Sequence, residues 1–342
     1  MRKILNTMYV MSQGSYLHLE RETLKLDIEK KTVSRIPMHH IGDVVLFGNV
    51  MVSPFMLHRC AEDGRSVIFL SEYGRFKARL IGPQSGNVFL RRAQHLLLDE
   101  DRSLDLVKAL LAGKIQNTRS LVLRSAREAK NEQDQSMLKE IAKSLARSLL
   151  DLPSATDLDQ LRGIEGYAAK TYFHGFSSMI RKNRDDFLMN GRSRRPPKDR
   201  INALLSFLYA MLSNDCSSAL ESVGLDPQVG YLHALRSGRP ALALDLMEEF
   251  RPIFADRLAL TLVNRQQLKG SDFTERTGGA WEMSDGARKI ILTAVQNRKQ
   301  EEIMHPELKE KIPLGLAILI QARLMARFIR GESSEYIPFM PR

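Results

Sequence analysis

Apolar and polar residues alternate with a period of two in much of the first 80 residues. Five segments carry strand patterns, alternating or continuously apolar, over 15–20, 23–29, 44–48, 66–70 and 76–80. Alternation is typical of half-buried strands and short apolar runs of buried ones. Between the runs, Ser53 and Pro54 open a helical pattern over 53–61 as N-cap and first residue. The pattern predicts a β-rich N-terminal domain over residues 1–85.

The pattern changes after a break at residues 82–86, where glycine and proline concentrate. Leu, Ala, Arg and Lys then dominate, which favours helices. We expect helices over 88–98, 103–112, 114–127, 134–150, 200–212, 240–251, 253–268, 284–298 and 313–329. The prediction is an α+β protein: a β-rich N-terminal domain followed by a larger all-α domain over residues 86–342.

The segment 241–251 carries an unusual set of carboxylates. Its apolar residues recur at helical spacing and form a core-facing stripe: Ala243, Leu246, Met247 and Phe250. Asp245, Glu248 and Glu249 share the opposite side. Pro240 suits the first helical position, and Pro252 ends or bends the helix. One interpretation is a helix with an acidic, solvated face; the other is a site built with His233, a dozen residues upstream.

Glu165 lies between Gly163 and Gly166 in a segment that begins as a helix. Glycine costs about 1 kcal/mol in a helix interior, so this placement needs a reason. Close approach of a ligand or another backbone to Glu165 is one reason. A notch for helix packing, with Glu165 in solvent, is the other, and the residues alone do not separate them.

Residues 181–200 form a basic segment with eight Lys or Arg against three Asp. Pro196 and Pro197 oppose helix formation there, so we expect a loop. Such a loop suits contacts to DNA phosphates, and a mobile, solvated loop is the alternative. The predicted nucleic-acid contacts are Arg181, Lys182, Arg184, Arg192, Arg194, Arg195, Lys198 and Arg200.

The helix that follows the basic segment carries three polar residues on one face. Asn202, Ser206 and Tyr209 are spaced by four and three residues. They are therefore able to hydrogen-bond together in the wall of a site.

Composition narrows the class of protein. The 342 residues contain 51 Lys and Arg against 40 Asp and Glu, a formal net charge of +11 that favours a polyanionic partner such as nucleic acid. Cys60 and Cys216 form no metal-binding motif and indicate buried thiols in a reducing compartment. The apolar run 312–320 is too short to span a bilayer, and the N-terminus lacks the pattern of a signal peptide. We expect a soluble, cytoplasmic protein without membrane contact.

Four sequence blocks, taken in order, resemble one family closely. They are Arg162-Gly-Ile-Glu165-Gly, Pro196-Pro-x-Asp199-x-x-Asn202-x-Leu-Leu-Ser206-x-x-Tyr209, Gly230-Tyr-Leu-His233 and Asp245-Leu-x-Glu248-x-Phe-Arg251-Pro. The family is the CRISPR-associated integrase-endonuclease, the catalytic one of the two core proteins of spacer acquisition. The resemblance covers nearly the whole chain and is strongest to the version found with type I-C systems.

The resemblance implies a function and a site. It implies a divalent-metal-dependent endonuclease and integrase that inserts short DNA fragments into a CRISPR array, through attack by a 3′-hydroxyl. The implied metal ligands are Glu165, His233 and Glu248, with Mg²⁺ or Mn²⁺ as the ion. Asp245 is implied as a supporting acidic residue, and Glu249 is left out. The implied partners are the prespacer duplex and the CRISPR repeat, a second copy of the chain in a homodimer formed through the N-terminal domain, and a small companion protein.

Two other functions stay open at this point. A repair nuclease acting on branched DNA would use the same metal site. A non-catalytic, basic DNA-binding scaffold would leave the Glu165 and His233 blocks without an explanation.

Overall fold

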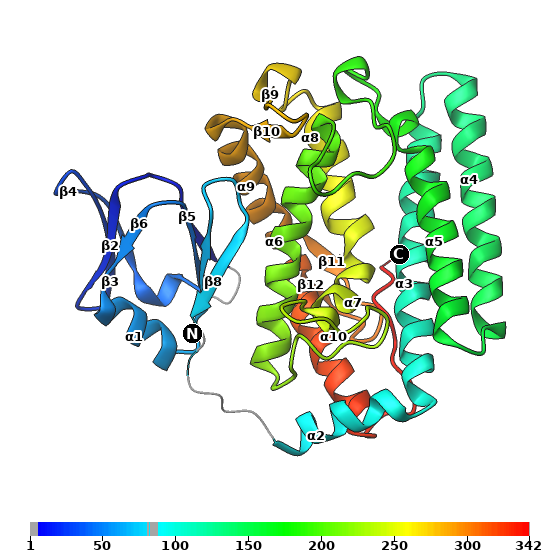
Figure 1. Cartoon of the computed structure of the whole chain (residues 1–342), viewed down its shortest axis with the longest axis horizontal. Coiled ribbons are helices and arrows are strands. Elements are labelled where there is room, and N and C mark those ends of the chain that lie inside the picture. Colours follow the sequence, from blue (N-terminus) through cyan, green and yellow to red (C-terminus); the bar gives the residue numbers. More distant parts are fainter. Residues whose placement is uncertain (1–5, 81, 83–87, 342) are drawn as a thin grey trace. The chain divides into compact units, whose positions relative to one another are not determined.

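The computed structural model describes residues 6–80, 82 and 88–341. The chain divides into two compact units, Met1–Gly86 and Asn87–Arg342. The first is rich in β-strands and the second is helical, so the predicted α+β class is confirmed (Figure 1). The predicted break at 82–86 lies almost entirely outside the described residues.

The described residues of the N-terminal unit form two four-stranded sheets, one α-helix and one short 3-10 turn at Met38–His40. The first sheet has the order β1-β5-β7-β8, with β1 and β7 parallel to β5 and β8 antiparallel to β7. The second has the order β4-β3-β2-β6, antiparallel except for the β2–β6 pair. The strands are β1 Thr7–Val10, β2 Ser15–Glu20, β3 Thr23–Ile28, β4 Lys31–Pro37, β5 Asp43–Phe47, β6 Val50–Val52, β7 Val67–Leu70 and β8 Phe76–Leu80.

Leu17, Val44 and Val67 belong to one apolar core in this unit together with Met56 of α1 (Pro54–Glu62). The Ser53 hydroxyl accepts the Met56 amide at 3.2 Å, as expected for an N-cap. All five predicted strands are present. The pattern missed β1, β4 and β6, and each of these lies at the edge of its sheet. Edge strands are short or polar because only one side is paired, so they lack the buried-strand pattern.

Long helices build the second unit (Figure 1). They are α2 Val88–Leu96, α3 Arg102–Glu128, α4 Glu132–Asp151, α5 Leu158–His174, α6 Arg200–Ser222, α7 Ala241–Phe250, α8 Arg257–Asn264, α9 Asp285–Gln300 and α10 Leu314–Ile329. The helices α3, α4 and α5 pack against one another, and α7 packs between α3 and α6. Two short antiparallel pairs, which the pattern did not predict, join this unit: β9 Phe273–Glu275 with β10 Trp281–Met283, and β11 Glu302–Met304 with β12 Lys311–Pro313.

The helical run changes its winding at Pro252. Residues Arg251–Asp256 form a π-helical turn between α7 and α8. Proline lacks an amide hydrogen and clashes with the preceding turn, and a wider turn relieves both problems. The α-helix α7 thus ends at Phe250, just before Pro252, and the helical run continues through the wider turn into α8.

Within the described part of the chain, no helix combines the length and the apolar character needed to cross a membrane.

Candidate active site

The helix α7 is buried on every side, including its acidic side. Asp245, Glu248 and Glu249 are 0%, 2% and 0% exposed. The interpretation of α7 as a helix with a solvated acidic face is therefore wrong. Buried carboxylates are costly unless paired, so each requires specific partners.

Asp245 is satisfied by the loop that carries His233. Its carboxylate accepts the backbone amides of Tyr231 at 2.6 Å, Leu232 at 3.1 Å and His233 at 3.0 Å. It also contacts His233 Nδ1 at 2.6 Å. A carboxylate partner at Nδ1 holds the hydrogen on that nitrogen and leaves the Nε2 lone pair free. That nitrogen points toward Glu248, with 3.7 Å between His233 Nε2 and Glu248 Oε1.

Two further residues fix the His233 loop. A Cβ at Gly230 would lie 2.5 Å from the Ala241 carbonyl carbon and 2.7 Å from Asp245 Oδ2, so only glycine allows the loop to approach α7 this closely. From α5, the Arg162 guanidinium donates to the Leu232 carbonyl at 3.1 and 3.0 Å. These contacts hold the Gly230 block of the sequence against the Asp245 block.

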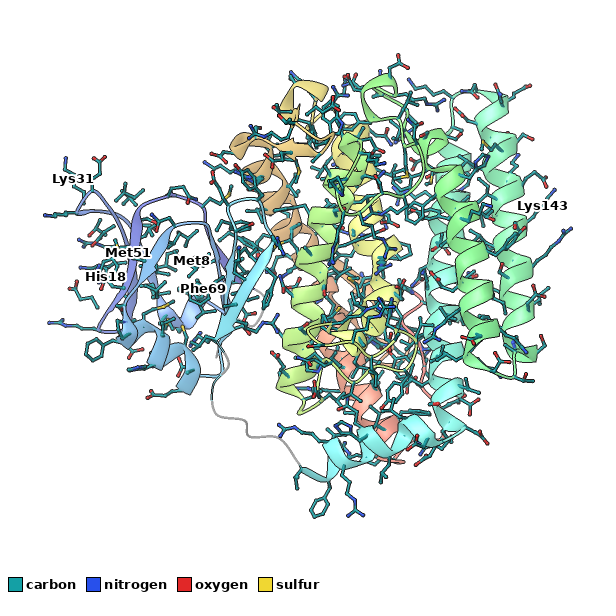
Figure 2. The ribbon with its side chains drawn as sticks, in the orientation of Figure 1. Met8, His18, Lys31, Met51, Phe69 and Lys143 are labelled. Carbon is teal, nitrogen blue, oxygen red and sulfur yellow. The ribbon has the colours of Figure 1, made fainter. Side chains whose placement is uncertain are left out.

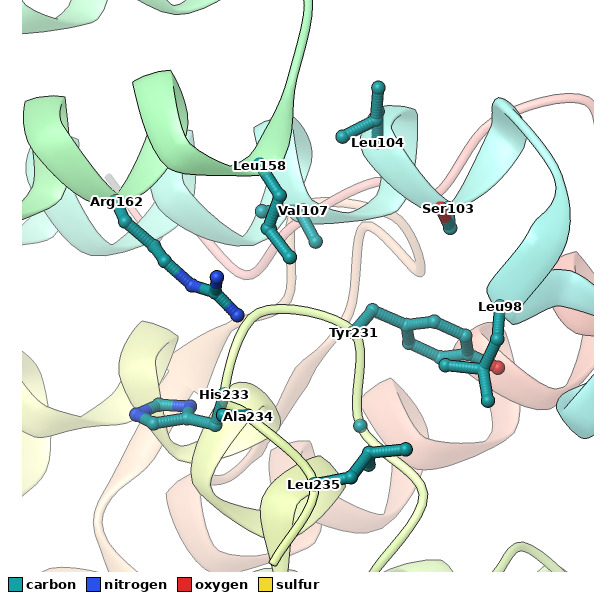
Figure 3. Close-up of a pocket in the computed structure, with 11 residues that line it drawn as sticks. Leu98, Ser103, Leu104, Val107, Leu158, Arg162, Tyr231, His233, Ala234 and Leu235 are labelled. Carbon is teal, nitrogen blue, oxygen red and sulfur yellow. The ribbon is translucent and has the colours of Figure 1, made fainter.

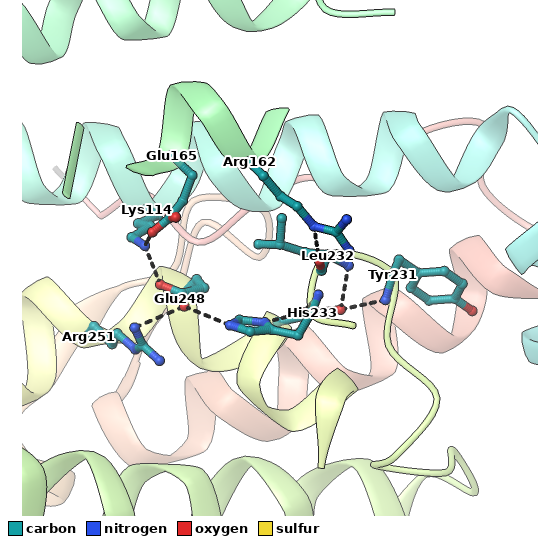
Figure 4. A network of polar contacts seen from close by, with 9 residues as sticks. Lys114, Arg162, Glu165, Tyr231, Leu232, His233, Glu248 and Arg251 are labelled. Atoms are coloured by element: carbon teal, nitrogen blue, oxygen red, sulfur yellow. Dashed lines mark hydrogen bonds and ion pairs between the residues drawn. The ribbon is translucent and has the colours of Figure 1, made fainter. Parts of the chain in front are cut away.

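Glu165 and Glu248 face the same ammonium group. Lys114 of α3 forms ion pairs with both carboxylates, with 2.8 Å between its Nζ and Glu248 Oε2 (Figure 4). Arg251 contacts the other oxygen of Glu248 at 3.0 Å. Burial by itself raises the pKa of the Glu248 carboxyl. The nearby Arg251, Lys114 and His233 lower it by more than burial raises it, and the resulting pKa is about 2. Glu248 is therefore ionised at neutral pH although its side chain is buried.

The donors gathered here suit a divalent cation. Two carboxylates and an imidazole nitrogen are ligands for Mg²⁺ or Mn²⁺, and an ammonium between the carboxylates marks a point where a positive charge is stable. Across the described residues, no three His, Cys, Asp or Glu side chains already form a group ready to hold a metal. The side chains of Glu165 and Glu248 are instead paired through Lys114. The three predicted ligands thus come together, with a cation of the protein's own between two of them.

The surroundings of Glu165 oppose the packing-notch interpretation. A Cβ added at Gly163 or at Gly166 would meet no atom within 4 Å among the described residues. Both glycines are exposed, so no helix packs into a notch there. The open space beside Glu165 is instead compatible with close approach of a ligand.

A pocket opens beside His233 (Figure 3). Its volume is about 320 Å³. The wall mixes polar and apolar surface, and its charged or titratable groups are Arg162, Tyr231 and His233. The lining residues are Leu98, Ser103, Leu104, Val107, Leu158, Arg162, Gly230, Tyr231, His233, Ala234 and Leu235. The imidazole is thus accessible from outside the helical core.

Glu249 faces away from the site and holds the C-terminal tail. It accepts the Tyr336 hydroxyl and the Phe339 amide, both at 2.6 Å, and the Gln321 amide at 3.2 Å. Burial raises the pKa of its carboxyl to about 7, although all three donors oppose that shift. Glu249 therefore anchors the tail, in a direction different from that of its neighbour Glu248.

A second buried carboxylate, that of Asp256, lies near Arg251 and is bound by two tyrosines. Asp256 accepts the hydroxyls of Tyr172 at 2.9 Å and Tyr209 at 2.6 Å. Burial raises the pKa of Asp256 to about 6, against the lowering effect of the two tyrosine hydroxyls and of Arg251. The Arg251 guanidinium also lies 4.9 Å from the centre of the Tyr209 ring, which links this cluster to Glu248.

The polar face predicted on α6 is present. Arg192 donates to Asn202 Oδ1 at 2.7 Å and to Ser206 Oγ at 3.2 Å, and its guanidinium lies 5.3 Å from the centre of the Tyr209 ring. The face therefore holds the basic segment against the helix.

The eight basic residues divide into two groups. Four have internal partners: Arg181 with Glu128, Arg184 with Asp134, Arg192 with Asn202, and Arg200 with the Asp186 carbonyl and the Trp281 ring. The others are exposed, and for their side chains the described residues provide no ion pair or hydrogen bond: Lys182, Arg194, Arg195 and Lys198. Contact of these eight residues with nucleic acid stays a prediction.

Sequence reasoning missed three residues that hold the site together. Lys114 lies in a long helix rich in Lys and Arg, where nothing distinguishes it. Gln94 is fully buried and donates to the carbonyls of Asp226 and Val229, which fixes the start of the His233 loop. Asp256 follows Pro252 by four residues. Its position as an acidic residue within an apolar helical segment was the only sequence feature that could have indicated a buried, partnered carboxylate.

Comparison with known proteins identifies the family. The family model described as CRISPR associated protein Cas1 matches residues 8–297. The chain is 56% identical to the CRISPR-associated endonuclease Cas1 1 of Moorella thermoacetica over 343 aligned residues, covering 100% of both chains.

Solved structures share the fold at low sequence identity. A Cas1 protein from Thermotoga maritima superposes with a TM-score of 0.82 at 23% identity, covering 97% of this chain and 99% of that one. A casposase bound to integration product gives a TM-score of 0.83 at 19% identity, covering 97% of this chain and 93% of that one. At these identities the likeness shows the fold alone.

The raised pKa of Asp256 predicts a pH dependence of stability. Between pH of about 4 and 6 the folded protein keeps a proton that the unfolded chain has lost, so the free energy of unfolding falls as the pH rises. The decrease is about 3 kcal/mol across that window. Asp256→Asn stays neutral and keeps both tyrosine contacts, so its unfolding free energy should fall less than that of wild type in metal-free denaturant titrations from pH 4 to 6, and the fall that remains comes from Glu249. The exposed Asp105→Asn is the control, and equal slopes for wild type and Asp256→Asn would contradict the assignment.

Proposed function

Because the chain belongs to the Cas1 family of CRISPR-associated proteins, in which relatives are endonucleases, we propose that it is a divalent-metal-dependent integrase of DNA. It joins the 3′-hydroxyl of a short prespacer duplex to a strand of the CRISPR repeat. With water in place of that hydroxyl, the same site cuts DNA. The observation that carries the proposal is the convergence of Glu165, His233 and Glu248 from three separate segments.

Mg²⁺ or Mn²⁺ is the proposed ion, and Glu165, His233 Nε2 and Glu248 are its proposed ligands. When bound there, the ion would polarise the scissile phosphate and favour ionisation of the attacking hydroxyl. The fit rests on the donor set and on the cation already accepted between the two carboxylates.

The residues around the ligands have separate roles in this proposal. Asp245 orients His233 and keeps its Nε2 free toward Glu248. Arg251 holds Glu248 in place and offsets its charge in the buried site. Arg162 fixes the His233 loop from α5, the helix that also carries Glu165. His233 and Glu248 are thus positioned by contacts that do not depend on the ion.

DNA would approach over α5 and the basic segment. Gly163 and Gly166 leave open space beside Glu165, which suits a phosphate backbone. Arg194 and Arg195 are exposed and available for phosphates. The fold is shared with a casposase that was solved with an integration product bound, so it is a fold that accommodates such DNA.

The family resemblance supports a homodimer formed through the N-terminal unit and a complex with a small companion protein. The type I-C assignment stays a prediction.

Strand transfer separates this function from its alternatives. A short duplex is incubated with a repeat-containing supercoiled plasmid, with and without the companion protein and Mn²⁺. Joined products that need Mn²⁺ support the integrase. Cleavage of branched DNA without joining would favour a repair nuclease, and binding without any metal-dependent product would favour a scaffold.

The first prediction concerns the ligands. Glu165→Ala, His233→Ala and Glu248→Ala should each abolish joining and cleavage. Folding and DNA binding should mostly remain in the first two variants, whereas Glu248→Ala should also lower the free energy of unfolding, because it leaves the buried Arg251 without its carboxylate partner. Asp245→Asn should cost about 10–100-fold in metal affinity or activity, the usual effect of removing a carboxylate behind a ligating histidine. The exposed Glu140→Ala is the control. Full activity of His233→Ala in Mn²⁺ would remove His233 from the ligand set.

The second prediction concerns the glycines beside Glu165. Gly166→Ala should raise the free energy of unfolding by about 0.5–1 kcal/mol, since alanine is the better helix former and the site is open. The same methyl group should reduce DNA affinity and joining if a DNA backbone passes there. Thermal unfolding and strand transfer are measured on the same preparation, and a stabilised variant with unchanged joining would contradict the close approach.

The third prediction concerns the basic segment. Replacing Arg194 and Arg195 by alanine should weaken binding to all DNA sequences. It should also reduce the slope of log affinity against log salt by roughly 2, because each phosphate that a side chain neutralises adds about 0.9 to that slope. Arg184→Ala, which breaks the pair with Asp134, should instead lower stability with less effect on the slope. An unchanged slope in the double variant would exclude these arginines from the DNA-binding surface.

A further inference from the structure

Lys114 is the cation at the centre of the proposed metal site. Its side chain is 11% exposed, and its ammonium pairs with Glu165 from α5 and Glu248 from α7 (Figure 4). A lysine this buried is stable as a charged group only when it is paired. The two carboxylates, brought close by the packing of α3 against α5 and α7, equally need a positive charge between them.

We propose that Lys114 is the resident cation of the metal-free site and that a divalent ion displaces its ammonium from Glu165 and Glu248. This inference rests on the proposed function, because it takes those carboxylates as metal ligands. Both cations need the same oxygen atoms, and two positive charges a few ångströms apart in a buried site repel each other strongly. Occupation by one therefore opposes occupation by the other.

The displaced ammonium has space nearby. A small pocket of about 30 Å³ borders Lys114 and Glu165. The Asp256 carboxylate lines it and offsets the charges of Arg194 and Arg251, which line it as well. The flexible four-carbon stem of lysine allows the ammonium to move while the helix stays in place. Lys114 thus lets the site fold without metal and lowers its affinity for metal.

Mn²⁺ binding to the DNA-free protein tests the competition. Lys114→Met keeps the apolar stem without the charge, so Mn²⁺ should bind about tenfold tighter or more by isothermal titration calorimetry, because no charge-assisted hydrogen bond has to be broken. In EDTA this variant should unfold at a lower temperature than wild type, and Mn²⁺ should raise its melting temperature by more. Lys143→Met is the control, since Lys143 is an exposed residue of α4 (Figure 2). Equal or weaker Mn²⁺ binding by Lys114→Met would overturn the proposal.

Chemical labelling of the wild-type protein gives a test that does not depend on the folding of a variant. Acetylation of Lys114, followed by mass spectrometry of its peptide, should become faster when Mn²⁺ is added, while Lys143 reacts at the same rate. Unchanged or slower labelling of Lys114 would contradict displacement.

Mn²⁺ binding by His233→Ala distinguishes a failure of the proposed metal site from a failure of the proposed role of Lys114. If wild type does not bind Mn²⁺, or if His233→Ala binds it equally well, the proposed metal site is wrong. If wild type binds, His233→Ala binds more weakly and Lys114→Met binds no tighter, only the role of Lys114 is wrong.

Discussion

The burial of three carboxylates on one ten-residue helix is the constraint on which the helical unit depends. Each carboxylate of α7 needs partners from outside its own helix, and each recruits a different part of the chain. Asp245 binds the His233 loop, Glu248 binds Lys114 of α3, and Glu249 binds the C-terminal tail. Because an unpaired buried charge is so costly, these contacts join four distant segments around one point.

The same requirement explains why the candidate ligands are positioned so firmly. Asp245 has no freedom to move, since three backbone amides and an imidazole surround it. His233 therefore presents one nitrogen to Glu248. Glu248 is in turn fixed by Arg251 from one side and Lys114 from the other. Rigid supports of this kind are what a site needs when its ligands must hold an ion and a phosphate in register.

Much of the architecture was predictable from local sequence. Alternation identified β2, β3 and β8, short apolar runs identified β5 and β7, and a capping residue placed α1. The order and spacing of four blocks also indicated the family, and with it Glu165, His233 and Glu248. Edge strands β1, β4 and β6 escaped because strand pairing on one side leaves no strong pattern.

Sequence alone determined that the chain is basic, that it has a β-rich part and a helical part, and which acidic and histidine residues form motifs. Only the tertiary structure decided that the acidic side of α7 is buried, that Glu249 turns to the tail, and that Lys114 lies between Glu165 and Glu248. The physical reason is that helical periodicity fixes which residues share a face, whereas burial of that face depends on segments far away in the chain. Lys114 pairs with residues 51 and 134 positions later, and no local pattern records such a contact.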